Sequence, residues 1–393
     1  SDQVLSITPN TQEEVEVLKN VSTQYETNLW QPVSSDHIEA ETPVHLYVPA
    51  NSSEAVMDLL QKHGMTHVLL ANADELIEMQ MRNDSTDPRS GSTFYQKYHP
   101  LEVIYSWINR TTHDYSSTVK AILVGSSYEK RPLYALKLSL NNRPNKKAMW
   151  IDCGIHAREW ISPAFCLSFV HHALSFYNQN REITDILDSM DIYVLPVLNP
   201  DGYKHTWTKN RLWRKNRSLR RGTNCVGVDL NRNFDASWGQ GASHDPCSEI
   251  FCGSFPESEP ETQAVADFLR SHKDSIQLYI TIHSYSQKLL FPFSYITDEP
   301  ENLSDLLEMA KGAADNIRKY YLNHYAYGSG GKALLAPGGS DDWAYNLGIK
   351  YSFTFELQDR GRYGFLLPES QIDRACKEAL TGVKTIALNV IEK

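Results

Sequence analysis

Short apolar runs alternate with segments of helical periodicity from about residue 119 to the end of the chain. The runs are short, rich in β-branched and aromatic residues and mostly unbroken. Continuous apolar runs are typical of strands that are buried on both faces of a sheet. The pattern predicts an α/β fold with a largely parallel or mixed sheet. The expected strands are Val119–Val124, Leu133–Leu138, Ala148–Ile151, Ile192–Leu198, Leu278–Ile282 and Tyr351–Phe355.

The first quarter of the chain has a different pattern, in which strand-like and helix-like segments are short. Val44–Val48 is apolar and extended, and Ser53 is expected to cap an amphipathic helix that runs to His63 and ends at Gly64. A second strand is expected at Thr66–Leu70 and a second helix at Ala73–Arg82. These elements predict a small α+β domain.

A polar segment, Asn83 to Ser92, separates the two patterns and contains Pro88 and Arg89. Small polar residues and a proline end a helix and leave the backbone exposed, so a trypsin-like protease could cleave after Arg89. The alternative is an interdomain linker that contains an arginine by chance. We therefore expect one domain at residues 1–89 and a second at residues 90–393, which a chain of 393 residues can accommodate.

Charge supports this division. Residues 1–89 contain 15 Asp and Glu against four Lys and Arg, a net charge of −11, whereas the whole chain carries −10. The remainder is thus almost neutral. No apolar run approaches the roughly 20 residues that span a bilayer, so no membrane association is expected.

Glycosylation sequons and cysteines favour an extracellular protein. Asn-x-Ser/Thr occurs six times, and Asn20, Asn51 and Asn83 lie in the first quarter, where we expect glycans. Cys153 with Cys166, and Cys225 with Cys247, could close short loops as disulfides; the alternative is buried thiols. Although Ser1 opens a polar segment with no signal peptide, we expect secretion.

Candidate metal ligands follow two of the expected strands. His156 and Glu159 lie three residues apart in a turn after the strand that ends near Asp152, and His283 follows Leu278–Ile282. Two histidines and a carboxylate with one open position form a catalytic zinc site. A His-x-x-Glu pair alone is more often a surface turn.

Three further segments favour a metal site over a surface turn. Together with the metal motif they resemble the pancreatic-type zinc carboxypeptidases, the procarboxypeptidase A/B family. They are Val228–Phe234 (VDLNRNF), Thr281–Tyr285 (TIHSY) and Tyr351–Leu357 (YSFTFEL). The resemblance covers essentially the whole chain, including an acidic propeptide. It implies a mixed, eight-stranded sheet flanked by helices, preceded by a small antiparallel α+β sandwich, and cleavage between Arg89 and Ser90.

The resemblance also implies roles for single residues. One Zn²⁺ would be held by His156, Glu159 and His283, and Glu356 would be the general base. Arg214 would stabilise the developing oxyanion, because a buried cation is most effective where negative charge appears. The remaining substrate-binding positions are Asn231 and Arg232, which would clamp the terminal carboxylate, together with Arg158, Tyr285 and Ser294.

Asp341, within Gly338–Trp343, stands where B-type enzymes have an aspartate at the bottom of the specificity pocket. A buried carboxylate favours Arg or Lys and penalises an apolar side chain, which sets A-type specificity aside. Leu335–Gly339 and the sequon-rich propeptide are most similar to the plasma B-type enzyme. That similarity implies trimming of C-terminal lysines that lowers fibrinolysis; the alternative is a digestive B-type enzyme.

Three departures from the family are visible. Its mobile tyrosine is missing from Lys332–Pro337, where Leu334 stands closest to its place. The third B-type disulfide lacks a partner, which leaves Cys252 and Cys376 unpaired. His45 takes the place of a propeptide Asp that contacts the carboxylate-binding arginine, which implies a less tightly blocked zymogen.

Two other functions compete with a basic carboxypeptidase. A silent zinc protein that binds C-terminal peptides without cutting them would need neither Glu356 nor Arg214. A basic cluster at Lys209 to Arg221 could bind nucleic acid, but the acidic chain has no nucleic-acid motif. We expect a monomer whose partners are an activating trypsin-like protease and peptide or protein C-termini that end in Arg or Lys.

Overall fold

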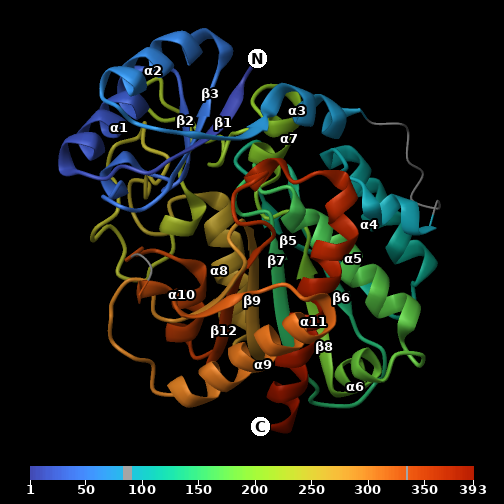
Figure 1. Cartoon of the computed structure of the whole chain (residues 1–393). Helices are drawn as coiled ribbons and strands as arrows, with labels where there is room; N and C mark the ends of the chain where they lie inside the picture. The colour runs from blue at the N-terminus through green and yellow to red at the C-terminus, as the bar shows by residue number, and fades with distance from the viewer. Residues whose placement is uncertain (83–90, 333–334) are drawn as a thin grey trace.

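The computed structural model describes residues 1–82, 91–332 and 335–393, which form a small N-terminal domain resting on a larger one (Figure 1). The small domain contains an antiparallel sheet in the order β2-β3-β1-β4. Helices α1 and α2 bury their apolar residues against β1 and β3. The bounds are β1 Gln3–Ile7, α1 Gln12–Gln24, β2 Asn28–Gln31, β3 Val44–Val48, α2 Ala50–Lys62, β4 Val68–Asn72 and α3 Ala73–Met81.

The predicted elements of this domain are present with two shifts. Helix α2 begins at Ala50 behind Pro49, so the prediction that Ser53 caps it was wrong. Pro49 is the N-cap residue, its backbone is extended, and no side chain caps this helix. The expected strand at Thr66–Leu70 is β4, two residues later, while β1 and β2 were not predicted.

The large domain is built on an eight-stranded sheet in the order β11-β10-β12-β9-β7-β8-β6-β5. The central strands β8, β7, β9 and β12 are parallel, and the strands toward both edges include antiparallel pairs. The mixed sheet confirms the predicted fold class. The strand bounds are β5 Val119–Ser126, β6 Pro132–Leu138, β7 Lys147–Cys153, β8 Met190–Leu195, β9 Ile276–Ser284, β10 Lys288–Phe291, β11 Ala326–Ser329 and β12 Tyr351–Leu357.

Helices cover both faces of this sheet, which explains why apolar residues of its central strands point to both sides. In β7, Met149 and Ile151 face one core, while Ala148 and Trp150 face the other. The first core includes α4 Leu101–Asp114, α5 Ile161–Phe176, α6 Arg181–Ser189, α7 Pro200–Thr208, α9 Leu303–Tyr321 and α11 Ile372–Glu392. The second includes α8 Pro260–His272 and α10 Ser340–Leu347.

The parallel strands β7, β9 and β12 end at the same edge of the sheet. The register pairs Cys153 with Ile282 and Leu357 with Ser284, so residues at these strand ends lie side by side. Loops at the carboxyl ends of parallel strands are where α/β proteins build their sites. In Figure 1 the small domain lies over this end of the sheet. None of the helices in the described residues is long and apolar enough to cross a membrane.

Candidate functional site

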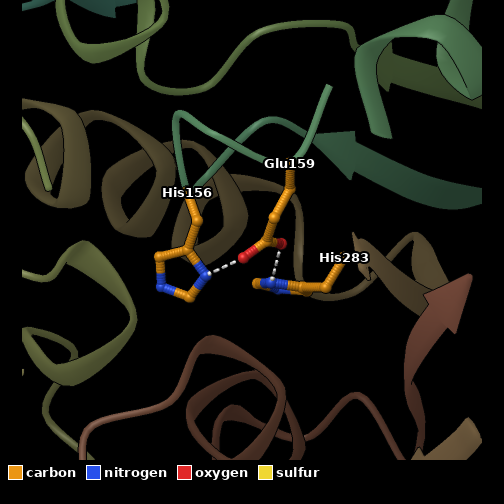
Figure 2. Close-up of side chains that lie close together, drawn as sticks. All are labelled: His156, Glu159 and His283. Carbon is orange, nitrogen blue, oxygen red and sulfur yellow. Dashed lines mark hydrogen bonds and ion pairs between the residues drawn. The ribbon is translucent and has the colours of Figure 1, made fainter. Parts of the chain in front are cut away.

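Two histidines and one glutamate converge at the ends of β7 and β9. His156 and Glu159 lie in the turn between β7 and α5, and His283 lies near the end of β9. The two carboxylate oxygens of Glu159 contact Nδ1 of His156 at 2.9 Å and Nδ1 of His283 at 3.1 Å (Figure 2). All three side chains are buried, and their ligand atoms lie within 4.8 Å of one another. Two imidazole nitrogens and a carboxylate oxygen are a donor set that fits zinc.

Asp229 orients His156 from the opposite side of the ring. Its Oδ1 lies 2.8 Å from Nε2 of His156, and its Oδ2 accepts hydrogen bonds from Nε and Nη2 of Arg214. Although burial opposes ionisation, Arg214, His156 and Arg232 hold the pKa of Asp229 well below its usual range. A carboxylate at Nε2 leaves Nδ1 of His156 as the metal-binding nitrogen. We assigned no role to Asp229 from sequence, although it lies within the quoted motif, two residues before Asn231.

The residues predicted to contact the oxyanion and the terminal carboxylate of the substrate lie around Asp229. Arg232 approaches Asp229 at 3.8 Å, and the backbone N–H of Asn231 donates to Oδ1 of Asp229 at 3.0 Å. Both arginine side chains are buried, Arg214 at 6% and Arg232 at 8% exposure. The side chains of Asn231, Arg232 and Arg214 line one cavity with the three candidate zinc ligands.

Glu356 lines that cavity from β12, the strand beside β9. Burial raises the pKa of Glu356 to about 7, against the lowering influence of His283. A carboxyl group that titrates near neutrality is suited to proton transfer.

The cavity, of about 250 Å³, extends to Asp341 in the first turn of α10. Oδ2 of Asp341 accepts a hydrogen bond from the Thr354 hydroxyl at 2.8 Å, and Oδ1 accepts one from the backbone N–H of Asp342. The carboxylate of Asp342 in turn accepts hydrogen bonds from the backbone N–H of Ser294, the predicted substrate-binding residue, which lines the same cavity. Among the described residues, neither aspartate forms an ion pair. Burial and then the neighbouring Asp341 raise the pKa of Asp342 well above its usual value.

Strand β2 of the small domain covers this cavity. Trp30 and Gln31 are part of the cavity wall, and Trp30 packs against Tyr285 and Phe365 with ring centroids 6.3 and 5.1 Å apart. Arg158, fully buried, donates to the side-chain oxygen of Asn28 at 2.8 Å. Two predicted substrate-binding residues, Arg158 and Tyr285, are thus in contact with the small domain.

His45, which takes the place of the family's propeptide aspartate, contacts Tyr285. Nδ1 of His45 lies 2.7 Å from the Tyr285 hydroxyl, because the pairing of β3 with β2 turns this residue toward that side of the cavity. The pKa of His37 is lowered by burial and then by the charge of Arg232.

A second contact between the domains involves α3. Oε1 of Gln80 accepts hydrogen bonds from the guanidinium of Arg211, and Nε2 of Gln80 donates to the Leu367 carbonyl at 3.1 Å. Arg211 also lies over the Trp160 ring, 3.7 Å from its centroid. Arg211, Arg214 and Lys215 are all buried, so Lys209 to Arg221 does not form a continuous exposed basic surface.

The remaining predicted positions fall into three groups. Cys153–Cys166 and Cys225–Cys247 are disulfides, and Cys252 and Cys376 remain buried thiols. Asn20 and Asn51 are exposed, whereas the sequon at Asn216 is fully buried. Asn83, Arg89, Ser90 and Leu334 lie outside the described residues.

Comparisons with known proteins agree with this geometry. Residues 104–382 match the family described as zinc carboxypeptidase, and residues 5–80 match the carboxypeptidase activation peptide. Carboxypeptidase B2 of Bos taurus is 51% identical over 395 residues, which cover 99% of this chain and 93% of the relative. Carboxypeptidase B of Rattus norvegicus is 45% identical over 394 residues, covering 100% and 94%.

A solved structure gives the same answer for the fold. The crystal structure of thrombin activatable fibrinolysis inhibitor (TAFI) is 50% identical and superimposes with a TM-score of 0.98, covering 100% of this chain and 99% of the other. With an activation peptide over a cavity that carries a zinc-type ligand set, and with both domains matched, this chain belongs to the zinc carboxypeptidase family.

Proposed function

We propose that this chain is the secreted zymogen of a zinc carboxypeptidase that removes C-terminal Arg or Lys from peptides and proteins. The observation that carries the specificity is Asp341, a carboxylate only 5% exposed and without an ion pair among the described residues. It shares a cavity with the candidate zinc ligands and with Arg232. A buried anion without a counter-ion selects a cationic side chain, because an apolar one would leave it unpaired.

The same cavity supplies two anchors for the end of a polypeptide. Arg232 and Asn231 are positioned to bind the terminal carboxylate, for which a planar guanidinium offers two parallel donors. Asp341 would receive the guanidinium or ammonium group of the last side chain. Because the carboxylate clamp requires a chain end, the arrangement favours an exopeptidase.

The chemistry is divided among the residues between these anchors. Zinc, when bound by His156, Glu159 and His283, polarises a carbonyl and acidifies water. Glu356 accepts the proton of the attacking water and returns it to the leaving amine. Arg214, held by Asp229, stabilises the negative charge that develops on the carbonyl oxygen. A silent binding protein would use neither of these last two side chains.

Latency follows from the small domain, which covers the cavity with Trp30 and Gln31 and engages Arg158 and Tyr285. Cleavage after Arg89, with residues 1–89 as the activation domain and 90–393 as the enzyme, would allow it to leave. By similarity to thrombin activatable fibrinolysis inhibitor, we propose a thrombin-like activating protease and removal of C-terminal lysines in fibrinolysis. We further propose an extracellular, monomeric protein with glycans at Asn20, Asn51 and Asn83.

One assay tests the central proposal. The full chain is treated with a trypsin-like protease, and release of C-terminal Arg, Lys and Phe is followed with and without a zinc chelator. Chelator-sensitive release of Arg and Lys is expected, with a new N-terminus at Ser90. Arg89→Gln is the matched control and should stay inactive. Preferential release of Phe would contradict the specificity, and activity that survives chelation would contradict the zinc site.

A further inference from the structure

A row of buried hydrogen-bonded side chains connects α10 with His283. The Thr281 hydroxyl donates to Oδ1 of Asp152 at 2.6 Å and lies 3.1 Å from Nε2 of His283. On its other side, Oδ2 of Asp152 lies 2.8 Å from the Tyr279 hydroxyl, which lies 2.6 Å from Oγ of Ser340. All these side chains are at most 2% exposed, so water does not compete for the bonds.

Asp152 fixes the direction of every bond in this row. Its Oδ2 also accepts the indole N–H of Trp150 at 2.9 Å, a group that can only donate. Among the described residues Asp152 forms no ion pair, so its stabilisation comes from these neutral donors. A carboxylate that accepts from three donors orients each of their protons toward itself.

The orientation of Thr281 determines which nitrogen of His283 carries a proton. A hydroxyl has one proton, and that of Thr281 is committed to Asp152. Its oxygen must therefore accept from Nε2–H of His283. In this tautomer Nδ1, the atom that faces Glu159, keeps its lone pair for a metal. Asp229 imposes the same tautomer on His156 by direct contact. Asp152 imposes it on His283 through the Thr281 hydroxyl.

The other end of the row reaches the specificity pocket. Because the Tyr279 proton points to Asp152, the Tyr279 oxygen accepts the proton of Ser340. The backbone N–H of Ser340 donates to Oδ1 of Asn231 at 3.1 Å. Ser340 begins α10 and immediately precedes Asp341, so Asp152 holds the helix end that presents the specificity carboxylate.

We propose that Asp152 is a positioning residue that acts at both ends of this row: through Thr281 it sets the metal-binding tautomer of His283, and through Tyr279 it fixes Ser340 and the start of the specificity helix. The inference rests on the proposed zinc site and pocket.

The first test measures zinc affinity rather than activity. Full-length wild type, Thr281→Val and Thr281→Ser are equilibrated with zinc–chelator buffers, and the metal retained per chain is determined. Valine matches the shape of threonine without a hydroxyl, whereas serine keeps it. We expect Thr281→Val to weaken zinc binding by about 10- to 100-fold and Thr281→Ser to stay near wild type.

Asp152→Asn tests the centre of the row. The indole of Trp150 cannot reverse, so the new amide N–H₂ is expected to face Thr281 and to turn the Thr281 proton toward His283. We expect zinc affinity to fall as in Thr281→Val, and the double variant to bind no more weakly than Thr281→Val alone, because both changes act on one path. Additive losses would overturn this path.

The pocket end is tested with Tyr279→Phe, which removes only the hydroxyl. After activation, KM for a C-terminal Arg substrate should rise about two- to tenfold, the value of one neutral hydrogen bond, while zinc affinity stays unchanged. Equal zinc affinity of wild type and Thr281→Val, or a Tyr279→Phe variant that loses zinc instead of substrate affinity, would overturn the inference. A wild-type chain that binds no zinc would overturn the proposed function itself.

Discussion

Glu356 and His283 are register partners in the parallel pairing of β12 with β9. The proposed general base and a proposed metal ligand are therefore fixed to one another by backbone hydrogen bonds of the sheet rather than by loops. Proton transfer needs such fixed geometry, because the base must lie within hydrogen-bond reach of the proton it accepts.

Glu356→Gln should therefore lose activity without losing the site. The amide cannot accept a proton at neutral pH, and we expect kcat to fall by about 10²- to 10⁴-fold while zinc content stays at one ion per chain. Steady-state kinetics of the activated enzyme with metal analysis checks this. Turnover within a few-fold of wild type would remove Glu356 from the proposed role.

Asp341→Ala should change specificity rather than overall competence. Loss of a buried charge pair should weaken transition-state binding of C-terminal Arg substrates by about 2 to 4 kcal/mol, which lowers their kcat/KM. The kcat/KM for Phe substrates should change little. Asp298→Ala, at an exposed aspartate, is the control and should change neither. Equal losses on Arg and Phe substrates would place Asp341 outside the pocket.

Leu322→Gly should stabilise the fold. Leu322 ends α9 with φ 53° and ψ 31°, and its side chain is 87% exposed, so it has a strained backbone and little burial to lose. Glycine adopts this conformation without strain, and we expect about 0.5 to 1 kcal/mol more free energy of unfolding. Leu322→Ala keeps the strain and should show no such gain in chemical denaturation.

Glu261 should make stability fall as pH rises. It is fully buried, accepts hydrogen bonds from Asn216 and the Tyr128 backbone, and its pKa is raised by burial to about 7. An acid whose pKa is higher in the folded chain favours folding while protonated, and this contribution is lost between pH 4.5, the ordinary value, and about 7.

The free energy of unfolding of the neutral analogue Glu261→Gln should therefore increase relative to that of wild type as pH rises from 4.5 to about 7, by at most about 3 kcal/mol. Denaturation of both proteins at several pH values checks the difference. A constant difference from pH 4.5 to 8 would contradict the titration.

The sheet could be predicted because its central strands are buried on both faces and therefore contain apolar residues that point to both sides. β10 and β11 were missed, since each is only four residues long and lies toward an edge. β1 and β2 were missed in the acidic domain, where no run of that kind marks them.

The candidate site was predicted in part, because its residues belong to motifs that follow strands. The role of Asp229 and the row through Asp152 could not be predicted, since which donor meets which acceptor depends on three-dimensional contacts. The contact of His45 with Tyr285 could not be predicted for the same reason, since strand register, which depends on the pairing of β2 with β3, decides which way a side chain points.

Because Gln80 and Arg211 hold the two domains together, cleavage of the chain and dissociation of the small domain are two separate events. Gln80 precedes Arg89, whereas its partners Arg211 and Leu367 follow it, so these contacts join the two domains without the linker and do not depend on an intact chain. Before the cut, the tether keeps the small domain at a high effective concentration; afterwards its return is a bimolecular event that depends on dilution. Activity should then appear with a lag set by the first-order dissociation of the small domain, rebinding should decrease on dilution, and the released fragment should act as a soluble inhibitor of its own enzyme.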